Sequence, residues 1–164
     1  MPVPVPAPAA TDIRFHFGVD DRILYVCRLL RKAARQGSRV LVRGEDPEMD
    51  LLDKALWTFD PQDFVPHHRL RPAQPVPPRL QRTPLWLTGQ DDVWPEGLRL
   101  PGVLVHLGSG PVEDAPQWKR VIEVVSQEEA DRRQARRRWQ AYKAQGWAVQ
   151  GLTAEVAEIA EVAT

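Results

Sequence analysis

Several residue types and patterns that define large classes of protein are scarce or missing in this sequence. Its 164 residues contain one cysteine, Cys27, so the chain cannot form an internal disulfide, which fits a reducing cytoplasm. No apolar run approaches the roughly 20 residues that a membrane helix needs. The first residues, MPVPVPAPAATD, have neither the basic region nor the apolar core of a secretory signal. We therefore expect a cytoplasmic protein with no membrane partner.

Neither sign of charge is in excess. The 22 Lys and Arg residues balance the 22 Asp and Glu residues, so the formal net charge is zero. A protein whose whole surface binds DNA usually carries a basic excess. Any DNA-binding role should therefore come from a local patch of the surface. Length and composition, with 43% hydrophobic and 27% charged residues, fit one globular domain.

Signals for catalysis and for cofactors are also weak. The segment HLGSGP (106–111) follows an expected strand, as a phosphate-binding loop would, but it lacks the G-x-G-x-x-G spacing and a Lys-Ser/Thr pair. No pair among the four histidines has the spacing of zinc ligands, and Cys27 falls on the core face of an expected helix. None of the three serines sits in a nucleophile elbow. We therefore expect no catalytic residue, no bound metal and no cofactor.

The sequence does have a regular alternation of strand and helix patterns. Short strands are expected at 13–17, 38–42, 85–88, 103–107 and 120–126. A first helix should follow Asp20 as its cap and end before Gly37, and Asp46-Pro47 should start a second helix. The longest helix is expected over 127–145. This alternation predicts an α/β fold with a largely parallel sheet.

Proline-rich and acidic segments mark the expected domain limits. Residues 1–11 alternate proline with valine and alanine and should form a disordered arm. Residues 12–150 should form the single α/β domain, in which the six prolines of 65–84 indicate a loop. Residues 151–164 are expected to be an acidic tail with a frayed helix.

The longest expected helix carries a basic stripe that contains a large aromatic residue. Arg132, Arg136, Trp139 and Lys143 recur at helical spacing and share one face. Such a stripe suits a nucleic acid, which would use the cations for phosphates and the ring for stacking. It also suits a short acidic peptide that ends in an aromatic residue, since an arginine can bind the terminal carboxylate. The spacing alone leaves these two interpretations open beside an ordinary solvated surface.

Two segments resemble the DNA polymerase III chi subunit family. DKALWTFDPQDFVPHH (53–68) is similar to the family pattern D-x-A-L-W … F-V-P-H, and RRRWQAYKAQGW (136–147) resembles its basic-aromatic-x-A-Y-(K/R)-x-x-G-aromatic pattern. Both occur in the family's order, and the likeness spans roughly 12–147. The resemblance implies a three-layer α/β/α sandwich, like nucleotide-binding folds but without a phosphate loop. It also implies a non-catalytic subunit of the bacterial DNA polymerase III holoenzyme.

The resemblance further implies two protein partners, with DNA contacted only indirectly. Chi subunits join the clamp loader through the psi subunit and grip the acidic C-terminal tail of single-stranded-DNA-binding protein. The implied psi-binding residues are Trp57, Phe64 and Pro66, although both aromatic residues could instead be ordinary core residues. The expected tail-binding residues are Val125, Arg132, Arg136, Trp139, Gln140 and Lys143.

Within the tail site, Arg136 is expected to bind the terminal carboxylate. Trp139 and Val125 should form walls for the terminal ring, and Arg132 and Lys143 should attract the acidic residues before it. The chain departs from the family in having Trp139 where Tyr is common and Gln140 where Lys is common, so one cation is missing. The rival interpretations are a direct nucleic-acid-binding module and an α/β enzyme of nucleotide metabolism.

Overall fold

The computed structural model describes residues 11–62, 64–72 and 74–160, with side chains up to residue 157. The expected arm therefore lies outside the described residues except for Thr11. That residue is buried, and its hydroxyl donates to the carbonyl oxygens of Ala115 and Trp118, each at 2.9 Å. Thr11 therefore packs with the sheet, and its place in the expected arm was wrong.

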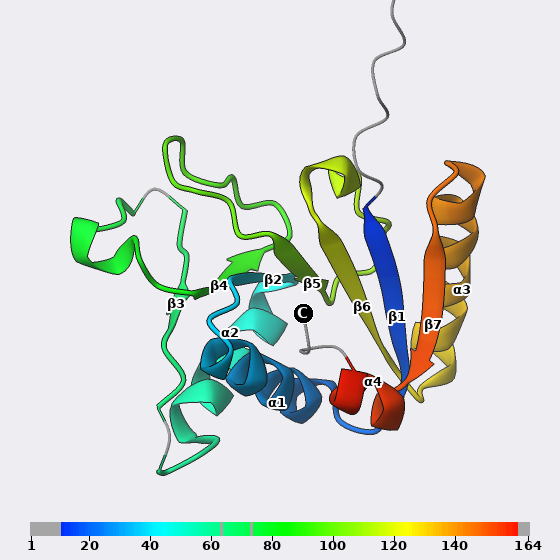
Figure 1. Ribbon diagram of the computed structural model, residues 1–164, viewed down its shortest axis with the longest axis horizontal. Coiled ribbons are helices and arrows are strands. Elements are labelled where there is room, and N and C mark those ends of the chain that lie inside the picture. The colour runs from blue at the N-terminus through cyan, green and yellow to red at the C-terminus, as the bar shows by residue number, and fades with distance from the viewer. Residues whose placement is uncertain (1–10, 63, 73, 161–164) are drawn as a thin grey trace, which may run out of the picture.

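Seven strands in the described part of the chain form one sheet in which every neighbouring pair is parallel. The spatial order is β3-β4-β2-β5-β6-β1-β7 (Figure 1). The strands are β1 Asp12–Val19, β2 Val40–Gly44, β3 His67–Arg69, β4 Leu85–Gly89, β5 Val103–His106, β6 Arg120–Ser126 and β7 Val149–Thr153. The prediction of an α/β fold with a largely parallel sheet is confirmed.

The helices of the described residues agree with the expected ones to within a few positions. They are α1 Arg22–Arg35, α2 Asp46–Thr58, α3 Glu129–Ala144 and α4 Ala154–Ala160, with short 3₁₀ turns at Pro78–Leu80 and Ala115–Gln117. The cap of α1 is Asp21 rather than Asp20, because Asp21 has the extended backbone and its carboxylate accepts from the Leu24 N–H at 3.1 Å. The first turn of α3 begins at Glu129, two residues later than expected.

Helices cover both faces of the sheet and make three layers (Figure 1). Strand alternation sends Val42 and Val124 to the face covered by α1 and α2, and Leu41 and Val125 to the other face. The second face is covered by α3 over β6 and β7. Over β5, β2 and β4, the same face of the sheet is covered by loop residues, including Trp118.

Two edge strands were missed in the sequence. β3 lies inside the segment 65–84, which was expected to be a loop, and among the described strands it pairs with β4 alone. Pro66 precedes it and Pro72 follows it, so neither proline interrupts the ladder. β7 pairs with β1 and continues to Thr153, so the expected domain boundary at residue 150 falls inside a strand.

The acidic segment after β7 forms α4 through Ala160. Ala154 packs against the core beneath α1 and α2, and Ala157 is fully buried. α4 therefore lies on the face of the sheet opposite α3. The basic stripe of α3 is not covered by this helix.

Candidate functional site

A pocket of about 250 Å³ lies between α3 and the strands β1 and β6. Its floor is apolar: Phe15 and Val125 are each 3% exposed, and Ala135 is buried beside them. The ring centroid of Trp139 lies 5.1 Å from that of Phe15, with the planes inclined at 52°. The full lining is Phe15, Phe17, Val125, Arg132, Ala135, Arg136 and Trp139.

Periodicity in both elements builds this pocket. Residues 132, 135, 136 and 139 of α3 are three or four apart, so their side chains share one face of the helix. Phe15 and Phe17 are two apart on β1 and reach the same side of the sheet. The pairing of β1 with β6 is interrupted after His16, and Gly18 has a φ of 74° there. Phe17 is thereby left 42% exposed at the pocket mouth.

The rim of the pocket is cationic. The side chains of Arg132 and Arg136 are 57% and 61% exposed. The carboxylate of Glu129 lies near both: one oxygen is 3.1 Å from Arg136 Nη2, and the other is 4.0 Å from Arg132 Nη1. An apolar hollow with two accessible guanidinium groups at its edge suits a ligand that has both a ring and carboxylates.

The pocket contains four of the six predicted tail-binding residues: Val125, Arg132, Arg136 and Trp139. Lys143 lies beyond them, with its ammonium 5.5 Å from the centroid of the Trp139 ring. Gln140 is exposed on α3 and does not line the pocket. The structure therefore does not bring Gln140 into the pocket.

Sequence reasoning found Val125 of β6 but missed the residues that β1 and β7 supply to the site. Phe15 and Phe17 were recognised as strand residues but not as site residues, although their two-residue spacing indicates a common face. Gly151 of β7 was also missed. A Cβ at Gly151 would lie 3.1 Å from Phe17 and 3.3 Å from Trp139, so a larger residue would press on both rings.

A second hollow of about 300 Å³ continues the pocket toward the start of α3. The two hollows share Phe17 and Arg132 and therefore form one groove. The continuation is more polar and includes Ser126 and Gln127. A peptide with an aromatic end in the first hollow could leave through the second.

Beneath the pocket, buried polar groups attach α3 to the sheet. Glu123 of β6 is fully buried, and its two oxygens accept from the Tyr142 hydroxyl at 2.6 Å and contact His106 Nδ1 at 2.7 Å. Arg138 Nε lies 3.2 Å from the same carboxylate. Burial alone would raise the pKa of Glu123, but His106, Arg138 and the Tyr142 hydroxyl outweigh it and hold the pKa below its usual range.

An aromatic patch lies on a different part of the surface. Trp57 at the end of α2 and Phe64 in the following loop are each 59% exposed, and their ring centroids are 5.3 Å apart. Pro66 is partly buried two residues further on. The structure thus brings Trp57, Phe64 and Pro66 to one area, with the two rings outside the core. Leu51, also on α2, is 60% exposed.

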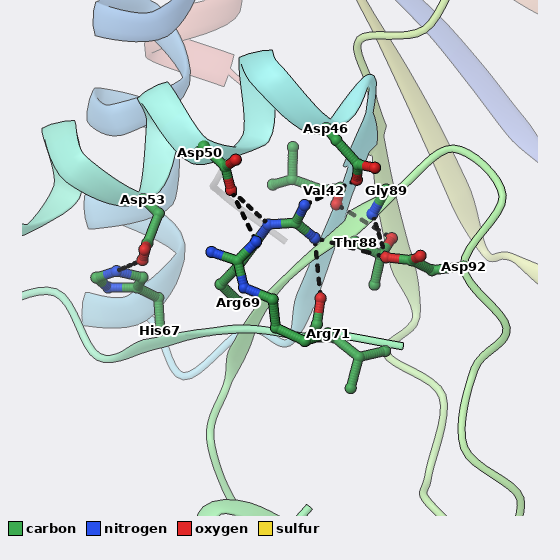
Figure 2. A network of polar contacts seen from close by, with 11 residues as sticks. Val42, Asp46, Asp50, Asp53, His67, Arg69, Arg71, Thr88, Gly89 and Asp92 are labelled. Atoms are coloured by element: carbon green, nitrogen blue, oxygen red, sulfur yellow. Dashed lines mark hydrogen bonds and ion pairs between the residues drawn. The ribbon is translucent and has the colours of Figure 1, made fainter. Parts of the chain in front are cut away.

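A polar network holds α2 against β3 behind this patch (Figure 2). His67 links β3 to the helix: its Nδ1 lies 2.7 Å from the Val65 carbonyl oxygen, and its Nε2 lies 2.9 Å from the Asp53 carboxylate. The ring of His67 also lies 5.1 Å from that of Trp57. Figure 2 shows the neighbouring guanidinium of Arg69 surrounded by carboxylates: Asp46 at 2.8 Å, Asp50 at 3.3 Å and Asp92 at 3.5 Å.

The carboxyl edge of the sheet carries acidic side chains where a phosphate group would bind. At the carboxyl edge of the sheet, where such folds bind nucleotides, Asp21, Asp46 and Asp131 stand at the starts of α1, α2 and α3. The described residues contain no group of three or more side chains placed to hold a metal ion. Burial raises the pKa of the Cys27 thiol to about 11, so it is a protonated core residue.

None of the helices described is both long enough and apolar enough to cross a membrane.

The fold is that of an α/β protein built like a nucleotide-binding domain, and its surface carries an apolar pocket with a cationic rim and an exposed aromatic patch. The family profile described as DNA polymerase III chi subunit, HolC, matches residues 10–150. The chain belongs to this family, and it is an accessory subunit of the replicative polymerase rather than a catalytic one.

Three relatives are each named DNA polymerase III subunit chi. The protein of Pseudomonas aeruginosa is 30% identical over 137 residues, which cover 79% of this chain and 84% of the relative. That of Haemophilus influenzae is 28% identical over 122 residues, covering 74% and 79%. That of Escherichia coli is 27% identical over 129 residues, covering 74% and 78%.

Proposed function

We propose that this chain is a cytoplasmic adaptor that binds the acidic C-terminal tail of single-stranded-DNA-binding protein in the α3 pocket and psi at the aromatic patch. It would hold the clamp loader close to coated single-stranded DNA by raising the effective concentration of one partner near the other. The observation that carries the proposal is the combination of an apolar floor with two accessible arginines at its rim.

The pocket supports a tail that ends in an aromatic residue. Its floor of Phe15, Val125 and Ala135 offers apolar contact, and full burial of a Phe side chain contributes about 1.5–3 kcal/mol. Arg136 stands at the edge of this floor and can receive the terminal carboxylate in a two-pronged hydrogen bond. Arg132 extends the positive charge along the groove toward Gln127, where residues before the ring would pass.

The aromatic patch supports a second protein partner. Two exposed rings bordered by a proline make a compact apolar surface, which is typical of an interface anchor. The His67–Asp53 contact and the Arg69 network fix α2 and β3 beneath these rings. A pre-positioned anchor loses less conformational freedom when a partner binds.

The test is a titration of a labelled synthetic peptide of Asp and Gly residues that ends in Phe with a free carboxylate. We predict that Arg136→Ala weakens binding about 10- to 100-fold, because a hydrogen bond to a charged group contributes about 1.5–3 kcal/mol. Arg132→Ala should weaken it only a few fold, mostly at low salt, because exposed ion pairs contribute roughly 0.2–1 kcal/mol.

Two controls test whether a loss of binding is specific to the pocket and to the terminal carboxylate. Arg137→Ala removes the same charge from an exposed position of α3 that does not line the pocket, and it should leave binding nearly unchanged. A peptide with an amidated terminus should bind as weakly to the wild type as the free peptide binds to Arg136→Ala. Equal losses in all three variants would contradict the pocket. Tighter binding of oligothymidylate than of the peptide would favour a direct nucleic-acid-binding module.

A further inference from the structure

We propose that Glu129 is an internal competitor for the α3 pocket, a carboxylate of the chain itself that occupies the arginines which an acidic ligand needs. This inference rests on the proposed function of the pocket. It adds a residue that weakens binding and thereby sets which tails are accepted.

The geometry of Glu129 is that of a ligand rather than of a remote neighbour. Its Oε1 lies 3.1 Å from Arg136 Nη2 in a hydrogen bond, and its Oε2 lies 4.0 Å from Arg132 Nη1. One carboxylate thus spans the two cations of the rim. Glu129 is seven residues before Arg136, two turns of helix away, so its side chain must extend along the helix to reach that guanidinium.

The atoms used in this contact indicate competition rather than support. A carboxylate that only positions an arginine for a ligand leaves free the guanidinium N–H groups that the ligand uses. Glu129 instead binds an Nη atom of Arg136, which a ligand's carboxylate would use in a two-pronged contact. An incoming carboxylate therefore competes with Glu129 for the charge of Arg136 and for one of its Nη donors.

The exchange has a consequence for specificity. A ligand that brings one carboxylate replaces one ion pair by another of the same kind and gains little from charge. A ligand with further acidic residues also meets Arg132 as it leaves along the groove, so its net gain is larger. Glu129 therefore favours tails with several negative charges close to the terminal ring over tails with a lone terminal carboxylate.

The contact is weak enough to be displaced. The side chains of Glu129 and Arg136 are 63% and 61% exposed, and ion pairs in such positions are worth little in water. The competitor therefore lowers affinity without closing the pocket. Asp131 shares the first turn but is engaged elsewhere, since it accepts from the Ser126 N–H at 2.7 Å.

The test is the same peptide titration with Glu129→Gln, which removes the charge and keeps the shape. Glu128→Gln is the matched control, because it removes one negative charge from the adjacent exposed position, whose side chain makes no cap hydrogen bond. We predict that Glu129→Gln binds the acidic peptide about two- to five-fold more tightly than Glu128→Gln does. The gain should disappear when Arg136→Ala is added to both variants.

The outcomes separate the inference from the proposed function. The wild type could bind the peptide through Arg136 while Glu129→Gln binds it no more tightly than Glu128→Gln does. That result would refute competition by Glu129 and leave the proposed binding in the α3 pocket intact. Weaker binding by Glu129→Gln would also refute the competition, because Glu129 would then be positioning Arg136. An equal gain with and without Arg136 would refute it as well. If neither wild type nor Glu129→Gln binds the peptide, the proposed function fails and the inference fails with it.

Discussion

Gly151 lies so close to two aromatic rings that the Cβ of any other residue would press against them. A Cβ there would lie 3.1 Å from Phe17 Cε1 and 3.3 Å from Trp139 Cζ3, closer than ordinary van der Waals contact. The residue belongs to β7, directly beside Phe15 of β1 in the pairing register. Gly151 thus allows the strand to approach the rings that shape the pocket mouth.

We predict that Gly151→Val weakens peptide binding several-fold, because its methyl groups displace Trp139 and Phe17 from their places at the pocket. Val suits a strand well, so the sheet should remain folded. The measurement is the peptide titration together with tryptophan fluorescence and thermal unfolding. Gln150→Val, at the adjacent exposed position of β7, is the control and should bind normally. Normal binding by Gly151→Val would show that this close approach has no part in the site.

At the scale of elements, α3 is fixed to the sheet by buried polar groups in addition to apolar packing. The Tyr142 hydroxyl donates to Glu123 at 2.6 Å and accepts from the Val112 N–H at 2.8 Å. Arg138, 2% exposed, contacts Glu123 at 3.2 Å and donates to the Ser109 carbonyl at 3.2 Å. Because the same helix carries Arg132, Arg136 and Trp139, these groups determine where the pocket wall stands.

We predict that Tyr142→Phe lowers the free energy of unfolding by about 1–3 kcal/mol, since it leaves the Val112 N–H without its acceptor and removes one of the donors to Glu123. The pKa of Glu123 is held below its usual value, so the group stabilises the fold above that value, near pH 4.3, and this contribution is lost as pH falls through the lower folded pKa. Without the hydroxyl the folded pKa should rise, and acid unfolding should begin at higher pH.

Urea unfolding of wild type and Tyr142→Phe, followed by circular dichroism from about pH 7 down to about pH 3, measures both effects. Tyr25→Phe is the control, because its hydroxyl contacts His16 Nδ1 at 2.6 Å on the other side of the sheet rather than Glu123. It should destabilise the protein without moving the acid transition in the same way. Identical acid transitions for all three proteins would contradict the assigned role of Glu123.

The elements also show what sequence could and could not predict. The stripe of α3 was predictable because residues 132, 136 and 139 are related by local helical period. The opposite wall was not, because Phe17 and Gly151 meet only after β1 and β7 pair across more than a hundred residues. β3 was hidden by Pro66 and Pro72, which an edge strand tolerates at its ends and a central strand would not. The patch required the family resemblance, since spacing alone fits core aromatic residues equally well.

At the scale of the whole molecule, the two candidate surfaces are widely separated. α2, which carries Trp57, packs on β2, β3 and β4, whereas α3 packs on β6 and β7. The helices also cover opposite faces of the sheet, and they stand apart in Figure 1. Two partners could therefore occupy one molecule together without contact between their sites.

The central claim is that one chain joins two proteins through these independent surfaces. We predict that Trp57→Ala combined with Phe64→Ala abolishes binding of psi and leaves peptide affinity unchanged, because both rings are exposed and far from α3. Arg136→Ala should show the reverse pattern. The folding of each variant can be checked by circular dichroism.

The most direct measurement is a titration of the labelled acidic peptide into the purified complex of this chain with psi, followed by analytical ultracentrifugation. We predict that psi stays bound, that the peptide joins the complex with the affinity it has for the chain alone, and that each variant loses only its own partner. Displacement of psi by the peptide, or loss of both partners in one folded variant, would contradict the account.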